Sequence, residues 1–148
     1  MACDVRLSTA AFNAGDEINR FAAVHGEAGG IVSFTGQVRA GDDVEALELT
    51  HYGPLTLPGM EQLAGQVLAR WAVSGLLIIH RCGIMLPGEP IVLVAAAARH
   101  RRDAFAAADF AMDHLKSESW FWKREKRLGQ WRWVEPRAED FADIARWG

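Results

Sequence analysis

The three lysines of this chain are its most conspicuous candidates for chemistry. Lys116, Lys123 and Lys126 all fall within HLKSESWFWKREKR (114–127), although the chain holds 16 lysines and arginines. A lysine that is partly desolvated between aromatic side chains can have its pKa lowered until the amine acts as acid, base or nucleophile, which arginine cannot do. Lysines also commonly cap helix ends and decorate edge strands. The residue pattern alone slightly favours this second, structural role.

A second basic cluster, ARHRRD (98–103), lies where a strand is expected to give way to a helix. Each cation at the positive end of a helix is unfavourable by about 0.3–1 kcal/mol, so a bound anion would be favoured there. His100 and Arg101 are therefore candidate phosphate ligands, while Asp103 offsets part of the positive charge. The alternative, in which these side chains extend into water or pair with acidic residues, is equally open.

Arg39 and the isolated histidines are weaker candidates. Arg39 ends the strand-like part of FTGQVRAG (34–41) and precedes a glycine-containing turn. An arginine at a strand end can reach a ligand while the sheet fixes its base, but on its own an ordinary surface arginine is the favoured interpretation. Structural roles are expected for His25, His51, His80 and His114.

Tryptophans alternate with basic residues near the C-terminus, at Trp120, Trp122, Trp131 and Trp133. Such aromatics could stack the bases of single-stranded nucleic acid, or they could form cross-strand pairs in a hairpin core. Residues 99–137 carry ten lysines and arginines against six acidic residues, whereas the whole chain has a net charge of −3. An acidic body with a local basic surface fits a small anionic ligand better than long nucleic acid, so we expect the tryptophans to be core pairs.

Length and composition predict one compact domain spanning 1–148, because half of the 148 residues are hydrophobic and 24% are charged. Cys3 and Cys82 stand far apart, which predicts free thiols in a reducing compartment and no metal site. The sequence lacks a signal-like or membrane-spanning stretch, so we expect a cytoplasmic protein without a membrane partner. GxSxG, GxxxxGK[ST], GxGxxG and HExxH are absent, which leaves α/β-hydrolase, P-loop, dinucleotide-binding and zincin functions without support.

Hydrophobic periodicity predicts the elements that must position these residues. Helical spacing predicts helices over 16–25, 58–72, 100–117 and 138–147. β-branched or alternating stretches predict strands over 29–38, 44–52, 75–83 and 90–98, with two more around RLGQ (127–130). We expect 29–38 and 44–52 to form a hairpin around RAGDD (39–43). Helices interleaved with strands on short turns predict an α+β fold with largely antiparallel pairing.

Six motifs follow one another along residues 29–137. They are GGIVSFTGQVR, LELTHY with PGM after it, IIHRCGIMLPGE, ARHRRDAFAAADFAMDHLK, FWKRE and WVEPR. In this order they resemble the family of molybdopterin synthase catalytic large subunits, and so many ordered motifs make the resemblance highly specific. It implies an α/β hammerhead fold with a smaller antiparallel β subdomain.

The resemblance also implies an activity and partners. Large subunits of this family form a homodimer, and each binds one ubiquitin-like small subunit, which gives a heterotetramer. The C-terminal Gly-Gly thiocarboxylate of the small subunit enters the large subunit and donates sulfur to cyclic pyranopterin monophosphate (precursor Z). Two such donations form the dithiolene of molybdopterin. Because the sulfur arrives already reduced, no metal or redox cofactor is expected.

Matching by position, the resemblance implies that Lys116 and Lys123 are the active-site lysines, whereas Lys126 gains no role. The residues expected to bind the pterin or its phosphate are Arg39, His100, Arg101 and Arg137, together with Gln37, Val38, Arg124 and Glu125. Family members often carry lysine where this chain has Gln37. They also commonly join His-Tyr directly to Pro-Gly-Met, where this chain inserts GPLTL (53–57), and we expect this insertion to form a longer loop.

Two other functions stay open on the sequence. One is a binding module for single-stranded nucleic acid or a nucleotide phosphate, which would bind oligonucleotides with a steep salt dependence. The other is a family member retained only for assembly. The presence of both expected lysines argues against assembly alone.

Overall fold

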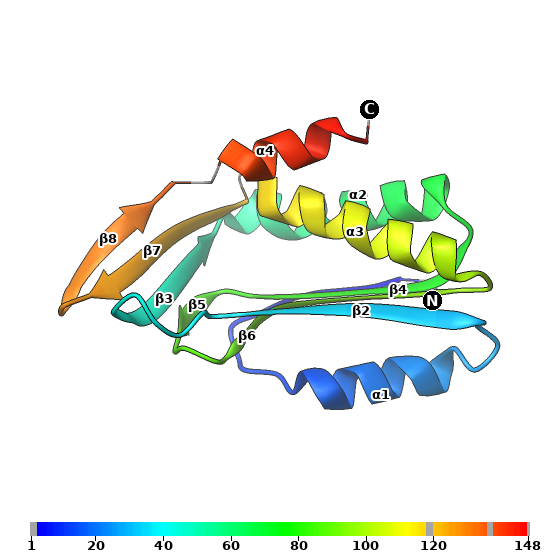
Figure 1. The fold of residues 1–148 in the computed structure, drawn as a ribbon, viewed down its shortest axis with the longest axis horizontal. Coiled ribbons are helices and arrows are strands. Elements are labelled where there is room, and N and C mark those ends of the chain that lie inside the picture. Colours follow the sequence, from blue (N-terminus) through cyan, green and yellow to red (C-terminus); the bar gives the residue numbers. More distant parts are fainter. Residues whose placement is uncertain (1–2, 118–119, 136–137, 148) are drawn as a thin grey trace.

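The computed structural model describes residues 3–117, 120–135 and 138–147 (Figure 1). The elements in chain order are β1 (Cys3–Ser8), α1 (Ala14–Val24), β2 (Gly30–Gln37), β3 (Val44–His51), α2 (Gly53–Arg70), β4 (Val73–Arg81), β5 (Gly83–Met85), β6 (Pro90–Ala98), α3 (Arg101–Ser117), β7 (Phe121–Arg127), β8 (Gln130–Val134) and α4 (Ala138–Ala145). The predicted α+β class is confirmed. The strands divide into two four-stranded sheets.

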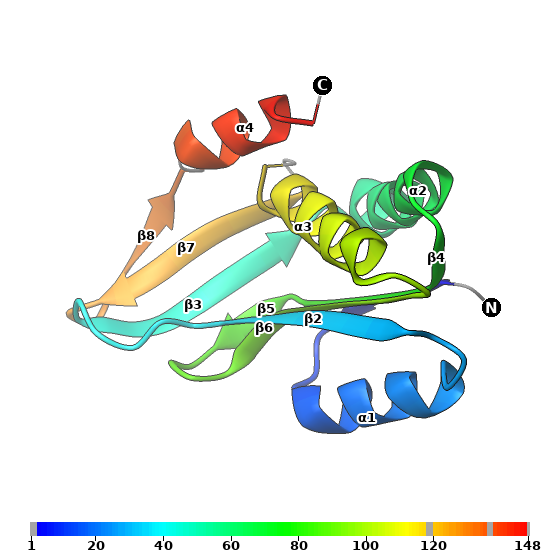
Figure 2. The same cartoon turned by 45° about the vertical axis from the view of Figure 1, so that its right-hand side comes forward.

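The first sheet has the strand order β1-β4-β6-β2 and forms the centre of the molecule. Helix α1 covers one of its faces and helices α2 and α3 cover the other (Figures 1 and 2). The middle strands are consequently buried on both sides: Leu76 to Ile79 of β4 and Val92 to Ala98 of β6 are at most 2% exposed. Continuous apolar runs, rather than alternating ones, are what strands covered on both faces need.

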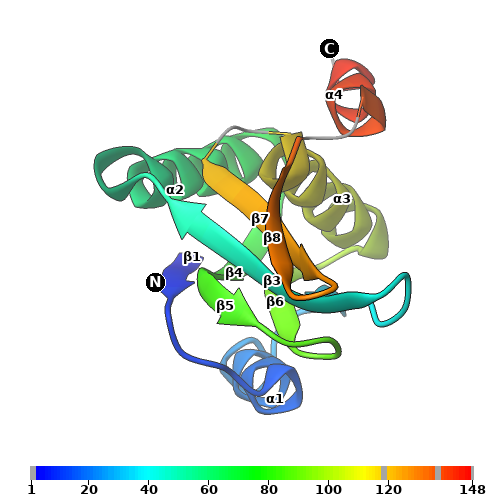
Figure 3. The ribbon, with the colours of Figure 1, turned by 90° about the vertical axis from the view of Figure 1, so that its left-hand side faces the viewer.

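The second sheet has the order β5-β3-β7-β8 and lies at one end of the first sheet (Figure 1), and Figure 3 views the molecule from that end. Strand β7 pairs antiparallel with β3, with His51 opposite Phe121, and then with β8. The turn between β7 and β8 places Leu128 and Gly129 at φ values of 50° and 74°. Positive φ at both central residues is typical of the type I′ turn, which matches the twist of the flanking strands. The predicted pair of strands around RLGQ is therefore confirmed.

The expected hairpin between residues 29–38 and 44–52 is wrong. Strand β2 pairs with β6 in the first sheet, whereas β3 pairs with β5 and β7 in the second. The RAGDD segment instead takes the chain from one sheet to the other, with positive φ at Gly41, Asp42 and Asp43. Strand β1, which the sequence analysis did not predict, pairs parallel with β4 and is the exception to the antiparallel pairing of the described strands.

The GPLTL insertion is not a loop, because helix α2 begins at Gly53 and includes it. Thr56, within the insertion, is fully buried. Its Oγ1 donates a hydrogen bond to the carbonyl oxygen of Trp120 (2.7 Å) and accepts one from the N–H of Tyr52 (2.9 Å). Gly59 allows the Trp120 indole to lie against the helix, since a Cβ there would sit 2.5 Å from Nε1. The insertion thus anchors the residue that leads into β7.

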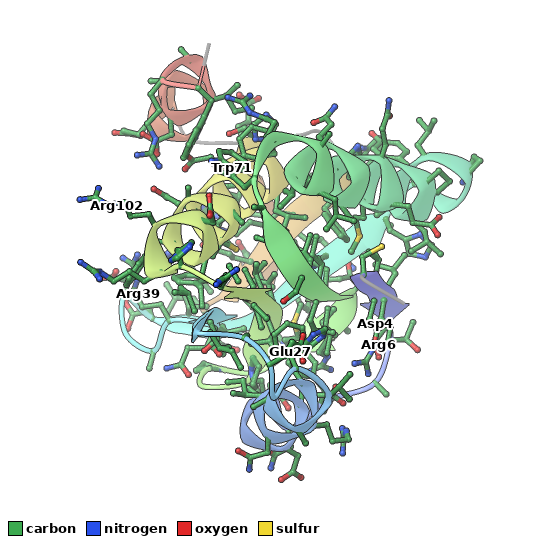
Figure 4. All side chains as sticks on the ribbon, turned by 90° about the vertical axis from the view of Figure 1, so that its right-hand side faces the viewer. Asp4, Arg6, Glu27, Arg39, Trp71 and Arg102 are labelled. Atoms are coloured by element: carbon green, nitrogen blue, oxygen red, sulfur yellow. The ribbon has the colours of Figure 1, made fainter. Side chains whose placement is uncertain are left out.

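Aromatic side chains fix the helical layer above the first sheet. Trp71, labelled in Figure 4, contacts Phe110 of α3 and Trp147 after α4, with ring centroids 5.0 and 5.5 Å apart. The Trp147 indole N–H also donates to Asp113 of α3 (2.5 Å), so α4 is held against α3. None of the helices in the described ranges has the length and apolar character needed to cross a membrane.

Candidate functional site

A cavity of about 1270 Å³ opens where the first sheet meets the second. Apolar side chains of both sheets, including Leu47, Leu49 and Val92, form part of its lining. Its polar lining residues include Gln37, Arg39, His80, Lys116, Lys123 and Glu125. Apolar walls with a few convergent polar groups are typical of a small-molecule site.

Two of the three lysines line this cavity, and they come from different elements. Lys116 is an exposed residue in the last turn of α3, directly after the buried Leu115. Lys123 lies on β7, opposite Leu49 of β3 and Val134 of β8. Its side chain is 45% exposed, so the lysine keeps contact with water.

Glu125 lies two residues after Lys123, on the same face of β7, and also lines the cavity. One carboxylate oxygen accepts a hydrogen bond from Arg127 Nη2 at 3.0 Å, and the other lies 4.0 Å from Lys123 Nζ. The ion pair restrains the lysine but leaves it ammonium donors for a ligand, since an ammonium group carries three. Glu125 therefore influences the site by pairing with the Lys123 ammonium group.

The segment that follows β2 brings Gln37, Val38 and Arg39 to the same cavity. Val38 is 3% exposed, and its backbone is held on both sides. Its N–H donates to the carbonyl of Glu89 (2.9 Å), and its carbonyl accepts from the N–H of Gly88 (2.8 Å). Arg39 extends outward from this fixed base, as Figure 4 shows. Its guanidinium can present paired N–H donors to an anion.

His80, for which the sequence predicts a structural role, also lines the cavity. This residue is 6% exposed near the end of β4. Its ring stacks on Phe121 with centroids 4.0 Å apart, and its Nδ1 lies 2.9 Å from the carbonyl oxygen of Arg81. Burial, with a smaller contribution from the positive charge of Lys116, lowers the pKa of His80 to about 4. The sequence signal was slight: a histidine at the end of the apolar run LLII.

His100 and Arg101 are not brought to the lysines within one chain. They stand at the start of α3, whereas Lys116 stands in its last turn. A helix of 17 residues is about 25 Å long, so the two predicted clusters lie at opposite ends of it. Arg102, labelled in Figure 4, extends outward at the same end as Arg101. Arg137 lies outside the described residues.

Arg124 projects from the opposite face of β7 from Lys123 and does not line the cavity. Its guanidinium pairs with Glu48 and lies over the rings of Trp131 and Trp133, 4.7 and 5.6 Å from their centroids. Trp133 also meets Trp122 edge to face at 5.7 Å, yet these two residues are 61% and 51% exposed. The expected cross-strand aromatic contacts exist, but Trp122 and Trp133 lie on the surface rather than in the core.

Residues 7–118 match the family model described as MoaE protein. This chain belongs to the MoaE family. A Ralstonia nicotianae protein described as molybdopterin synthase catalytic subunit is 41% identical over 147 residues, which cover 97% of this chain and 84% of that protein. A solved structure described as the molybdopterin biosynthesis MoaE protein from Burkholderia ambifaria is 40% identical with a TM-score of 0.83, covering 98% of this chain and 97% of that one.

The MoaE fold extends to more distant structures. A Helicobacter pylori structure described as a protein-protein complex of subunits 1 and 2 of molybdopterin-converting factor matches with a TM-score of 0.79. It covers 90% of this chain and 91% of that one at 18% identity, so this likeness shows the fold alone. Within this MoaE chain, the family model includes Lys116 and ends before β7, whereas the relatives that match nearly the whole chain also span Lys123.

Proposed function

We propose that this chain is the catalytic large subunit of a molybdopterin synthase. It transfers sulfur from the C-terminal thiocarboxylate of a ubiquitin-like small subunit to cyclic pyranopterin monophosphate. The observation that carries the proposal is the meeting of Lys116 from α3 and Lys123 from β7 in one cavity with Arg39. The relatives named above, one of them a synthase catalytic subunit 41% identical to this chain, support the same activity.

The lining of the cavity suits a flat heterocycle that bears a phosphate. Phe121 and the apolar residues Leu47 and Leu49 offer surfaces for the pterin ring system. Arg39 offers a planar fork of donors that matches two phosphate oxygens. Gln37, beside it, supplies a neutral polar group, so Arg39 is the cation of this segment that would hold the phosphate.

The two lysines divide the work of sulfur transfer. As the thiocarboxylate sulfur attacks the pterin, negative charge develops on the phosphate oxygen that departs from the ring, and Arg39 stabilises it. Lys116 lies beside the incoming thiocarboxylate, polarises it and shuttles a proton. Lys123, restrained by Glu125, orients the pterin or serves as the partner acid.

The other predicted ligands contribute in one of two ways: they reach the cavity of a second copy of the chain, or they support residues that line the cavity. In the homodimer that the resemblance implies, the start of α3 from one chain would face the cavity of the other, so that His100 and Arg101 contact the phosphate there. Val38 fixes the backbone from which Arg39 extends. Arg124, paired with Glu48 across β3 and β7, would hold β7 in place. A phosphate contact by Arg137 rests on the resemblance alone.

The partner proposal rests on the size of the cavity and on the family. A cavity of about 1270 Å³ is larger than a single pterin needs, because sites for drug-sized ligands run to roughly 300–1,000 Å³. The remaining space would accept an extended Gly-Gly tail, whose lack of side chains allows close approach. Two large and two small subunits would then form the heterotetramer. The comparisons do not support the alternative of a nucleic-acid or nucleotide-phosphate binding module.

The test is to mix the purified chain with a thiocarboxylated small subunit and cyclic pyranopterin monophosphate. Mass spectrometry should detect a pterin product with two added sulfurs. A parallel reaction with a small subunit that ends in an ordinary carboxylate is the matched control and should yield none. A thiocarboxylated partner that binds the chain but gives no sulfurated pterin would contradict the proposal.

A further inference from the structure

His80 is held in a single orientation. Its strand, β4, lies between β1 and β6, and His80 stands opposite Leu7 and Val92 in the two registers. The ring stacks on Phe121 with an interplanar angle of 20°, which fixes the plane of the imidazole. Because the carbonyl oxygen of Arg81 can only accept, the nitrogen 2.9 Å from it, Nδ1, carries the hydrogen. The other nitrogen, Nε2, is therefore a lone-pair acceptor.

This acceptor is uncharged, whereas the cations that line the same cavity can only donate hydrogen bonds. The cations Arg39, Lys116 and Lys123 line the same cavity as His80. The ring is nevertheless uncharged at neutral pH, since burial and the Lys116 charge both oppose its protonation. His80 thus offers a neutral acceptor close enough to Lys116 for the ammonium charge to act on it. A cationic donor and a neutral acceptor that line one cavity are suited to a group that both accepts and donates a hydrogen bond, and water is the simplest such group.

The proposed sulfur transfer requires a water molecule of this kind. When the thiocarboxylate sulfur has bonded to the pterin, the tail and the pterin are joined as a thioester. Water must then form a bond to the acyl carbon while the bond from that carbon to sulfur breaks. The tail leaves as a carboxylic acid and the pterin keeps the sulfur as a thiol, and both groups then ionise to solvent.

We infer that His80 positions this hydrolytic water, with Nε2 accepting a hydrogen bond from it beside Lys116. The inference rests on the proposed function. Its geometric support is the ring orientation set by Phe121 and Arg81 and the shared cavity with Lys116. A packing role needs only the stacked ring and the Nδ1 hydrogen bond, so the water-positioning role is the one that depends on Nε2.

A pair of variants isolates Nε2. The amide of glutamine reaches the Nε2 position and that of asparagine the Nδ1 position, so His80→Gln keeps an acceptor towards the cavity and His80→Asn removes it. Both are uncharged and both lose the ring stacking. His80→Phe provides a third test that keeps an aromatic ring of similar size. Circular dichroism and thermal unfolding establish which variants are folded.

The measurement is a single turnover of each folded variant with thiocarboxylated small subunit and pterin substrate, followed by mass spectrometry of the small subunit. In His80→Asn and His80→Phe, we expect a covalent adduct of small subunit and pterin to decay about tenfold more slowly than in wild type, and in His80→Gln to decay faster than in His80→Asn. Wild-type adduct decay in His80→Asn and His80→Phe, or equal slowing in the asparagine and glutamine variants, would overturn the inference. Absence of sulfur transfer by the wild-type chain would instead overturn the proposed function.

Discussion

Replacing Thr56 by valine should loosen the start of β7 and destabilise the whole fold. The substitution keeps the β-branched shape and exchanges the hydroxyl for a methyl group. Thr56 is completely buried, so water cannot replace the two hydrogen bonds that its Oγ1 makes with Trp120 and Tyr52. The Tyr52 N–H also points towards the Trp120 carbonyl, but at a longer 3.4 Å. The loss is therefore only partly compensated.

The magnitude follows from the groups left without good partners. A buried polar group that loses its hydrogen bond costs about 1–3 kcal/mol. We therefore expect Thr56→Val to lower the free energy of unfolding by about 2 kcal/mol. At this chain length each kcal/mol corresponds to roughly 2–4 °C, so Tm should fall by about 4–8 °C. Sulfur transfer should also slow, because Trp120 immediately precedes the strand that holds Lys123.

Urea unfolding followed by circular dichroism measures this change. Thr56→Ser is the matched control, since it keeps the hydroxyl and removes only the methyl group. We expect Thr56→Ser to be the more stable of the two variants, with the denaturant m-value unchanged in both. If Thr56→Val were as stable as wild type, the hydroxyl would not anchor Trp120, and the structural role assigned to the GPLTL insertion would be wrong.

Three further predictions concern a glycine pair, His80 and Glu17. Gly59→Ala should lower the free energy of unfolding by about 1–3 kcal/mol, because the added Cβ would clash with the Trp120 ring. Gly65→Ala in the same helix has open space for its Cβ and should raise the free energy of unfolding by up to about 1 kcal/mol. Urea unfolding measures both changes. The depressed pKa of His80 means that the unfolded chain binds an extra proton at this residue between about pH 6.5 and 4, so His80 alone should lower the free energy of unfolding by about 3 kcal/mol as pH falls through that range. In His80→Phe the free energy of unfolding should therefore fall less over the same pH range than in wild type. Hydrogen bonding from Arg6 lowers the pKa of Glu17, so this carboxylate contributes stability above its unfolded pKa that is lost as pH falls through the folded one. Glu17→Gln should therefore weaken the acid dependence of Tm, and an unchanged dependence would contradict that assignment.

The sequence predicted the elements well because their apolar patterns are local. The continuous runs LLII and VLVAAAA identify β4 and β6, and the spacing of Ala104, Ala108 and Leu115 identifies α3. Strand pairing is not local, and this is where the prediction failed. β2 and β3 are neighbours in sequence, but β2 completes the buried sheet beside β6 while β3 joins the other sheet. The helical start of α2 was missed because GPLTL contains residues that usually interrupt helices.

The site was predictable only in part from the residues. Lysines flanking aromatics suggested a catalytic role, and the family resemblance indicated that Lys116 and Lys123, rather than Lys126, are the active-site lysines. The alternation of side chains along β7 puts Lys123 and Arg124 on opposite faces, but it could not say which face would meet α3. The sequence predicted a structural role for His80, because a histidine in an apolar strand is usually structural. The role proposed for His80 depends on Phe121 and Lys116, which come close to it only in the folded chain.

The central claim is that the cavity between the two sheets transfers sulfur through Lys116. The most direct test compares Lys116→Ala with Lys126→Ala in a single turnover with thiocarboxylated small subunit and cyclic pyranopterin monophosphate. Lys126 lies on the same β-strand as Lys123 but on its other face, so it controls for loss of a nearby positive charge. We expect sulfurated pterin at a near wild-type rate from Lys126→Ala, and a rate at least about 100-fold lower from Lys116→Ala. Near wild-type sulfur transfer by a folded Lys116→Ala variant would contradict the account.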